Sequence, residues 1–269
     1  MTLQSLLAIF PLNDFFGIPK LASQHGEMVD HMLELVHWFM TALFVGWSVY
    51  LIIVLSRFRQ RKNPKADYVG VRGHASTHIE IGVIIVEAIL VLGFALPLWG
   101  ERSDAYPTGD DVLKMRAIGE KFQWTFQYPG LDKVLGRQDI KLVDTNANNP
   151  IGRDMKDANG ADDFIQTGTM TLPVDRPVIV DVTSKDVIHN LALIPMRMAQ
   201  DAVPGTRAHI WFKPTKIGEW DIICGQLCGP GHASMRATLS VVSQKDFDAL
   251  MKEKSEAAMK QAAAGSGKK

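Results

Sequence analysis

The sequence lacks net charge, because its 29 Lys and Arg residues are balanced by 29 Asp and Glu residues. Without a basic excess there is no electrostatic basis for binding nucleic acid, and no nucleic-acid partner is expected. Cysteine is scarce, with two residues in 269, and no C-x-x-C-H segment is present. A covalently attached c-type haem is therefore not expected. Chemistry that depends on thiols is confined to the one segment that contains both cysteines.

Long apolar runs are present only before Glu101, at residues 32–55 and 79–99. Each is long enough to span a bilayer, which takes a helix of roughly 20 apolar residues to cross about 30 Å of hydrocarbon. Together they predict a transmembrane α-hairpin; a buried hairpin in a large soluble protein is the alternative. A cleaved signal peptide is not favoured, because the short apolar patch LLAIF near the start has no basic residues before it.

The loop between the two runs is basic, and its cations predict the orientation of the hairpin. They are Arg57, Arg59, Arg61, Lys62 and Lys65. The positive-inside rule places such a loop in the cytoplasm and both termini on the outer side.

Two carboxylates, Glu80 and Glu87, lie seven residues apart in the second run and share a helix face. Carboxylates inside a membrane are costly, and they usually serve a function or face a protein partner. A hydrogen bond to a partner is the expectation for Glu87.

After residue 100 the pattern changes to short β-rich runs separated by turn residues, which is typical of a sandwich or barrel. A polar surface loop is expected at 145–162 and a helix from Gln244, followed by a flexible GSGKK tail. The predicted organisation is therefore a helical part at 1–100, a β domain at 101–243 and a C-terminal part at 244–269. Strands are expected at 122–128, 139–145, 169–175, 176–184, 209–215, 219–224 and 237–243.

The segment CGQLCGPGHASM contains Cys224, Cys228, His232 and Met235 at short, fixed spacings. Thiolate, imidazole and thioether form a soft ligand set that selects copper or zinc over magnesium and calcium. The thioether favours copper, because structural zinc sites are built from cysteine and histidine. His189, just after a strand-like run, is the best candidate for a further ligand.

Three interpretations of this cluster remain open from the residues alone. Cys224 and Cys228 would form a disulfide in an oxidising compartment, although the spacing with His232 and Met235 weighs against it. A single blue-copper ion would use one cysteine, two histidines and a weak axial methionine. Two bridging thiolates could instead hold two copper ions.

The segment is similar to the binuclear CuA site of cytochrome c oxidase subunit II, whose loop reads C-x-x-x-C-x-x-x-H-x-x-M. The stretches DVIH at 186–189 and DAVPG at 201–205 also resemble that family, and the likeness covers nearly the whole chain. The resemblance implies a membrane α-hairpin plus an all-β cupredoxin-like Greek-key barrel that faces the periplasm. It also implies the subunit of a haem–copper terminal oxidase that accepts electrons from cytochrome c. Those electrons would pass to haem in the catalytic subunit, where oxygen reduction is coupled to proton pumping.

The resemblance implies a ligand set for the two copper ions. Cys224 and Cys228 would bridge the pair, and His189 and His232 would each bind one ion. Met235 and the backbone carbonyl of Gln226 would complete the coordination.

Two departures from the family pattern affect other sites. Gln226 replaces the glutamate that binds an interfacial magnesium in the family, and an amide is a weaker ligand for a hard cation. The magnesium site is therefore not expected to survive unchanged. The aromatic stretch that receives electrons is also altered, and Phe122 and Trp124 are the candidates for that role, with simple core packing as the alternative. Glu80 resembles the glutamate at the mouth of a proton-uptake path.

The resemblance also implies partners and a location. The partners would be catalytic subunit I and the other oxidase subunits, a separate cytochrome c and membrane lipid. The location would be the bacterial inner membrane, crossed more than once, with both termini and the copper domain on the periplasmic side.

Four other functions are considered. A quinol oxidase subunit would lack the copper ligands, and a thioredoxin-like copper chaperone would leave His232, Met235 and the membrane spans unexplained. A nitric-oxide reductase subunit with CuA differs only in its partner, and nitrous oxide reductase is a larger soluble enzyme.

Overall fold

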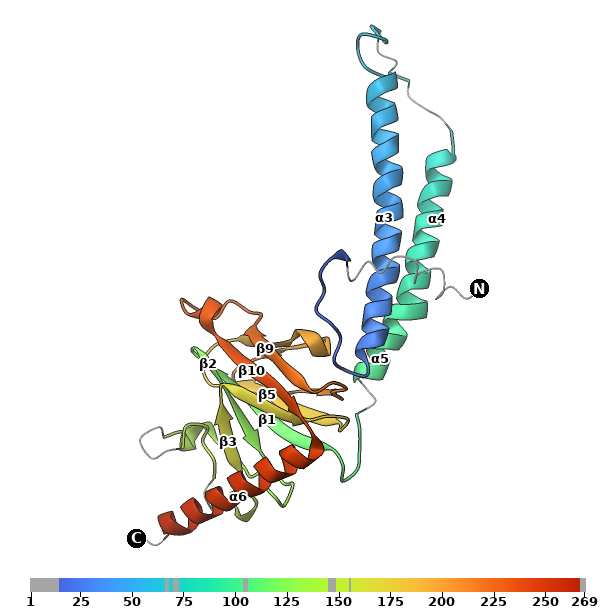
Figure 1. Ribbon diagram of the computed structural model, residues 1–269. Helices are drawn as coiled ribbons and strands as arrows, with labels where there is room; N and C mark the ends of the chain where they lie inside the picture. Colours follow the sequence, from blue (N-terminus) through green and yellow to red (C-terminus); the bar gives the residue numbers. More distant parts are fainter. Residues whose placement is uncertain are drawn as a thin grey trace. The chain divides into compact units, whose positions relative to one another are not determined.

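The computed structural model describes residues 15–65, 68–69, 73–103, 106–144, 149–154 and 156–266. The chain forms two compact units. One consists of residues 1–18 and 28–105, and the other of residues 19–27 and 106–269. Figure 1 shows the first as a pair of long helices and the second as a β domain with a C-terminal helix.

The helical unit contains two candidate membrane spans, Gly26–Arg57 with a mean hydropathy of 2.1 and Ala75–Glu101 with 2.6. The first is helix α3, Gly26–Arg57. Their 32 and 27 residues correspond to about 48 and 40 Å of helix, which exceeds the hydrocarbon thickness. Large apolar side chains such as Phe44 and Ile84 are exposed along both, as expected for helices whose solvent is lipid. The two predicted spanning helices are confirmed, and each extends beyond its predicted apolar run.

The second span is not a uniform α-helix. It consists of α4, Ala75–Leu90, a π-helical segment η1, Val91–Ala95, and α5, Leu96–Ser103. Short π-helical insertions widen the turn within an α-helix and are frequent at functional positions. Hydropathy alone predicts the length of the span and carries no signal for this insertion.

The β domain contains two five-stranded sheets. In the first the strand order is β3-β2-β1-β5-β8, and in the second it is β4-β10-β9-β6-β7. Strands β1 and β5 pair in parallel, as do β10 and β4, and the other pairs are antiparallel. The bounds are β1 Leu113–Glu120, β2 Gln123–Tyr128, β3 Phe164–Thr167, β4 Thr169–Pro173, β5 Val178–Ser184, β6 His189–Leu193, β7 Met198–Ala202, β8 Ala208–Phe212, β9 Gly218–Cys224 and β10 Arg236–Val242.

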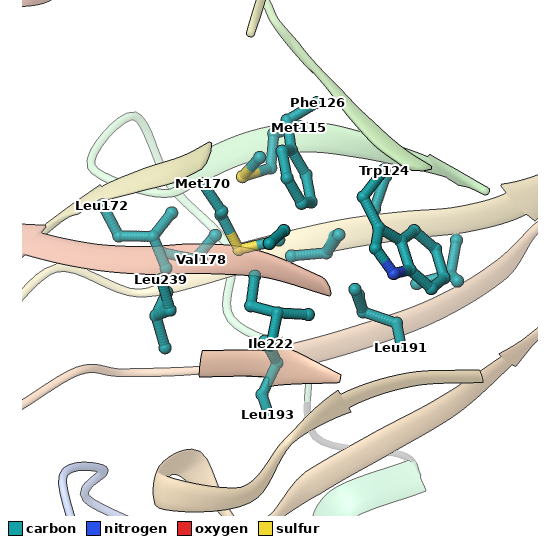
Figure 2. Packing of buried hydrophobic residues seen from close by; sticks show 14 of the residues in the cluster. Met115, Trp124, Phe126, Met170, Leu172, Val178, Leu191, Leu193, Ile222 and Leu239 are labelled. Atoms are coloured by element: carbon teal, nitrogen blue, oxygen red, sulfur yellow. The ribbon is translucent and has the colours of Figure 1, made fainter. Parts of the chain in front are cut away.

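Alternation of apolar and polar residues explains why these segments form strands that are buried on one face. In β5 every second residue is buried, and β10 shows the same period. Figure 2 shows side chains from both sheets meeting in one core, including Trp124, Phe126, Met170, Leu191 and Ile222. The predicted all-β cupredoxin-like domain is confirmed.

The prediction of a strand at 139–145 is wrong. Residues Ile140–Leu142 form a 3-10 helix instead. The Asp139 carboxylate accepts a hydrogen bond from the Lys141 N–H, and the Asp139 carbonyl accepts one from the Leu142 N–H. Such local bonds offer the backbone an alternative to a sheet, even where the residue pattern favours a strand.

Helix α6, Gln244–Ser266, forms where the sequence predicts a helix. Ser243 caps it, because its hydroxyl oxygen accepts from the Asp246 N–H and its O–H donates to the Asp246 carboxylate. Phe247 and Met251 are buried on the domain side, where α6 contacts β3 and β4. Of the predicted flexible tail, residues 267–269 lie outside the described part of the chain.

Candidate metal centre

Two free, buried thiols form the middle of the candidate site. Cys224 is the last residue of β9 and Cys228 lies in the loop that follows. Their Sγ atoms are 3.9 Å apart, about twice the length of a disulfide bond. The structure therefore presents two separate sulfur ligands and not a disulfide.

One imidazole lies against each sulfur. His189 begins β6, which pairs with β9, and its Nδ1 lies 3.9 Å from the Cys224 Sγ. His232 lies in the loop, in a 3-10 turn, with its Nδ1 3.8 Å from the Cys228 Sγ. A strand pairing thus brings together residues 35 positions apart in the sequence.

Two further donors complete an arrangement in which each sulfur has an imidazole and one weaker group. The Met235 Sδ lies 3.8 Å from the Cys228 Sγ, and the Gln226 carbonyl oxygen lies 3.2 Å from the Cys224 Sγ. All six predicted ligands therefore lie around one pair of sulfurs.

The spacing and chemistry of these donors meet the requirements of a metal ion. The ligand atoms of His189, Cys224 and Cys228 all lie within 4.8 Å of one another. Because metal–sulfur bonds are about 2.3 Å long, one ion can contact two sulfurs at this separation. Two thiols, two imidazoles and a thioether suit copper, and hard cations prefer oxygen ligands. The residues fit copper.

Comparison with known proteins agrees with this geometry. Residues 113–242 match the family described as the periplasmic domain of cytochrome C oxidase subunit II. The match runs from the start of β1 to the end of β10, so the β domain is similar to the periplasmic domain of that family. Subunit II is part of a haem–copper terminal oxidase, an oxidoreductase complex, so the fold, the membrane helices and a copper-binding domain form one consistent description.

Individual relatives are distant but extend over most of the chain. The alternative cytochrome c oxidase subunit 2 of Bradyrhizobium diazoefficiens is 28% identical over 227 residues, covering 84% of this chain and 79% of the relative. Cytochrome c oxidase subunit 2 of Cereibacter sphaeroides is 26% identical over 231 residues, covering 81% and 75%. The crystal structure of the periplasmic domain of subunit II from Bradyrhizobium japonicum is 29% identical, with a TM-score of 0.39, covering 58% of this chain and 97% of that structure.

Asp186 is a component of this candidate centre that the sequence analysis missed. Its Oδ1 lies 2.9 Å from the His189 Nε2, on the side of the ring opposite the thiols. Burial raises the pKa of Asp186, but hydrogen bonds from His189 and from the N–H groups of Lys121 and Val187 outweigh it and lower that pKa. A carboxylate three residues before the histidine was the available signal. That signal is informative only when the loop geometry is known, and the sequence does not reveal this geometry.

Aromatic packing encloses the centre on two sides. Trp124 is fully buried, and its ring centroid lies 6.0 Å from that of His189 in an edge-on arrangement. A Cβ on Gly119 would lie 2.9 Å from the His189 Cδ2 and 3.2 Å from the Trp124 Cζ3. Only glycine leaves the two rings this space.

Phe122 packs against the ligand loop itself. A Cβ on Gly231 would lie 2.4 Å from the Phe122 Cδ2, and one on Gly229 would lie 3.3 Å from the same ring. Gly229 also has a φ of +141°, a conformation that favours glycine. Both residues predicted to receive electrons, Phe122 and Trp124, therefore adjoin predicted ligands or their loop.

The protonation of the thiols is coupled to metal binding. Burial raises the pKa of Cys228, and the neighbouring Cys224 raises it further. Because a metal binds the thiolate, loading the site releases protons.

The remaining predicted functional residue, Glu80, lies on α4 of the helical unit. Leu43 and Trp47 of α3 line the same surface depression.

Proposed function

We propose that this chain is the subunit of a haem–copper terminal oxidase that accepts electrons from cytochrome c at a binuclear CuA centre. It would pass them to haem in the catalytic subunit, where oxygen is reduced and protons are pumped. The observation that carries this proposal is the pair of buried sulfurs 3.9 Å apart, each with its own imidazole. A single blue-copper site would use only one thiolate and would leave the second buried thiol without a role.

Each ligand would have a defined role in this centre. Cys224 and Cys228 would bridge the two ions, and His189 and His232 would each bind one. Met235 and the Gln226 carbonyl would occupy the weaker positions. When bound, copper supplies reversible one-electron chemistry. Cys224, Cys228, His189 and Met235 are buried, so the protein would exclude water from the copper and hold its ligands in place, which favours rapid transfer.

Electrons would reach the centre through Phe122 and Trp124. Phe122 lies against Gly231 of the ligand loop and Trp124 lies beside His189, which supports both candidates. Glu80 would lie at the mouth of a proton path into the catalytic subunit. The amide of Gln226 replaces a carboxylate, so an interfacial magnesium would be absent or altered.

The proposed location is a bacterial inner membrane, with both termini and the copper domain on the periplasmic side. The basic residues between the two spans support this orientation. The proposed partners are catalytic subunit I, the other oxidase subunits and a separate cytochrome c, within membrane lipid.

Copper content and near-infrared absorption of the purified full-length chain test the binuclear centre. We expect two copper ions per chain and a near-infrared band that changes in the variants His189→Ala and Met235→Ala. A matched control is His209→Ala, which replaces an exposed histidine that pairs with Asp181 away from the centre. One copper per chain, or none, would contradict the proposal.

The reaction of the complex needs a separate measurement. Purification of the complex through this chain, followed by oxygen and nitric oxide consumption assays, identifies which substrate the partner reduces. Consumption of nitric oxide without oxygen would reject the oxidase assignment while leaving the copper centre intact.

A further inference from the structure

A cleft of about 370 Å³ lies in the β domain between the first turns of α6 and the ends of β1 and β2. It is lined at the start of β1, by Leu113, whereas Gly119 near the other end of β1 contacts His189. Those six residue steps correspond to about 20 Å. None of the residues lining the cleft is a predicted copper ligand, so it is a separate feature of the domain.

One wall of the cleft is apolar. Phe247 and Met251 of α6 form its buried base, and Leu131, which is 49% exposed, provides accessible apolar surface. A ligand that covers Leu131 would be stabilised by removing this surface from water. The volume lies at the lower end of the range for small-molecule sites.

The rim of the cleft is cationic. Lys114, Lys133, Arg176 and Lys252 line it, against one carboxylate, Asp248. That carboxylate already accepts a hydrogen bond from the Gln244 amide. The rim therefore carries an excess of positive charge.

Arg176 is the cation best placed to bind an anion. Its side chain is only 12% exposed. Its Nε donates to the Asp111 carbonyl at 2.7 Å and lies 3.6 Å from the exposed Asp111 carboxylate. Within the described residues, the two terminal amino groups of its guanidinium have no hydrogen-bond partner. A guanidinium with both amino groups available binds carboxylate or phosphate in a bidentate manner.

Two residues at or next to the rim of the cleft have an unusual backbone conformation. Lys133 has a φ of +62° and Asp175, directly before Arg176, has a φ of +58°. They are two of the three non-glycine residues with positive φ in the described part of the chain. Such conformations are unfavourable and concentrate at binding sites. Lys133 and Arg176 both line the cleft, and the Lys133 Nζ donates to the Asp110 carbonyl at 3.2 Å.

We propose that this cleft binds an amphiphilic anion, with a carboxylate or phosphate head and a short unbranched apolar tail. The head would bind the amino groups of Arg176 with support from the surrounding lysines, and the tail would lie on Leu131, over the buried Phe247 and Met251. An inorganic anion leaves Leu131 exposed, and a neutral amphiphile leaves the cations unpaired. The site does not depend on the proposed copper function.

Ligand-observed NMR on the full-length chain in lipid nanodiscs tests this site. The probes are hexanoate and hexyl phosphate, which distinguish the two head groups, with acetate and 1-hexanol as controls that lack the tail or the charge. We expect one or both anionic amphiphiles to bind, with saturation transfer strongest at the tail protons. Affinity should fall as salt increases. Arg176→Gln should weaken binding about tenfold, because it removes a charge-assisted pair.

Exposed variants keep the test independent of folding. Lys114 and Lys252 are exposed, so Lys114→Gln combined with Lys252→Gln should leave the thermal unfolding temperature unchanged and still weaken binding. Lys260→Gln, on the same helix but outside the cleft, is the matched control and should bind as the wild type does. Equal binding of hexanoate and 1-hexanol, or unchanged affinity in both cleft variants, would overturn the proposal.

Discussion

Asp186 and His189 form the carboxylate–imidazole pair of the candidate metal centre, with 2.9 Å between Oδ1 and Nε2. The carboxylate holds the ring so that Nδ1 points at the Cys224 thiol. Such a partner fixes the tautomer of a ligating histidine and raises its basicity. Asp186 is therefore a positioning residue for the proposed copper ligand.

Replacement of this carboxylate should weaken copper binding without removing a ligand. We expect Asp186→Asn to lower copper affinity by about 10- to 100-fold and to shift the absorption bands, measured by copper titration of the metal-free chain. Asp181→Asn is the matched control, because Asp181 pairs with the exposed His209 at 2.7 Å away from the centre. Identical titrations for Asp186→Asn and the wild type would show that the pair has no influence on the metal.

Asp163 is a buried carboxylate in a polar cluster of the β domain. Its Oδ2 accepts hydrogen bonds from the Gln127 amide and the Gly136 N–H. Burial raises the pKa of Asp163 to about 6, although those bonds and Arg116 favour the ionised form. The folded protein therefore keeps a proton that the unfolded chain releases at a lower pH.

The free energy of unfolding of the domain should consequently fall as the pH rises towards the pKa of Asp163. Because the pKa of Asp163 is raised in the folded protein, the stabilisation that Asp163 contributes is present in full below about pH 4 and is lost as the pH rises to about 6. The loss is at most about 3 kcal/mol. Asp163→Asn should remove it, so the variant gains stability relative to the wild type between these pH values, measured by denaturant unfolding with tryptophan fluorescence. Parallel pH profiles for the two proteins would contradict this.

Among the elements, those determined by local pattern were predicted from sequence and those determined by distant pairing were not. The membrane helices follow from hydropathy, and α6 follows from its helical pattern and is capped by Ser243. Strand β6 was missed, because four of its five residues are buried and the alternation that marks a strand is absent. The 3-10 helix Ile140–Leu142 was missed because the hydrogen bond from the Lys141 N–H to the Asp139 carboxylate competes with sheet pairing.

The residues of the candidate site also divide into those that local spacing predicts and those that it does not. Cys224, Cys228, His232 and Met235 lie within one loop, so their spacing alone predicts a shared ligand sphere. His189 was a candidate from its place after a strand-like run, but its approach to the loop depends on the pairing of β6 with β9, which no local spacing encodes. Asp186, Gly119 and the contact of Phe122 with Gly231 are three-dimensional properties that no local spacing encodes.

Glu87 distinguishes the second membrane span from an ordinary apolar helix. It lies near the middle of the span Ala75–Glu101, with its side chain exposed, and the π-helical segment Val91–Ala95 begins one turn later. A carboxyl group in hydrocarbon is costly without a hydrogen-bond partner. Within the described residues Glu87 has none, so another subunit is the expected source.

Removal of this carboxyl should therefore weaken assembly. We expect Glu87→Leu to reduce the fraction of chain that co-purifies with the other oxidase subunits by roughly threefold, since one interhelical hydrogen bond in a membrane contributes about 0.6 kcal/mol. Glu87→Gln should retain most of the co-purification seen for the wild type. Ile89→Leu, at an exposed position on the same helix, is the control. Assembly of Glu87→Leu at the wild-type level would mean that this carboxyl binds no partner.

The molecule as a whole combines a lipid-soluble helical pair with a water-soluble domain, so the side of the membrane on which the domain lies decides which donors can reach it. The charges of the chain provide the orientation signal. Arg57 ends the first span, and Arg59, Arg61, Lys62 and Lys65 lie between the spans. In contrast, Glu27 lies in the first turn of the first span and Glu101 ends the second. By the positive-inside rule, we expect both ends of the hairpin to lie outside.

Reporter fusions measure this orientation directly. We expect green fluorescent protein fused after residue 269 to be dark and alkaline phosphatase at the same position to be active, because both report a periplasmic C-terminus. Fusions after Lys65, which retain only the first span, should give the opposite result. Replacement of the five loop cations by glutamine should raise the fluorescent fraction of the full-length fusion, since the charge asymmetry would be lost. A bright full-length fusion in the unaltered chain would place the domain in the cytoplasm, where a periplasmic cytochrome c could not donate to it, and would reject the proposed electron route while leaving the metal site itself untouched.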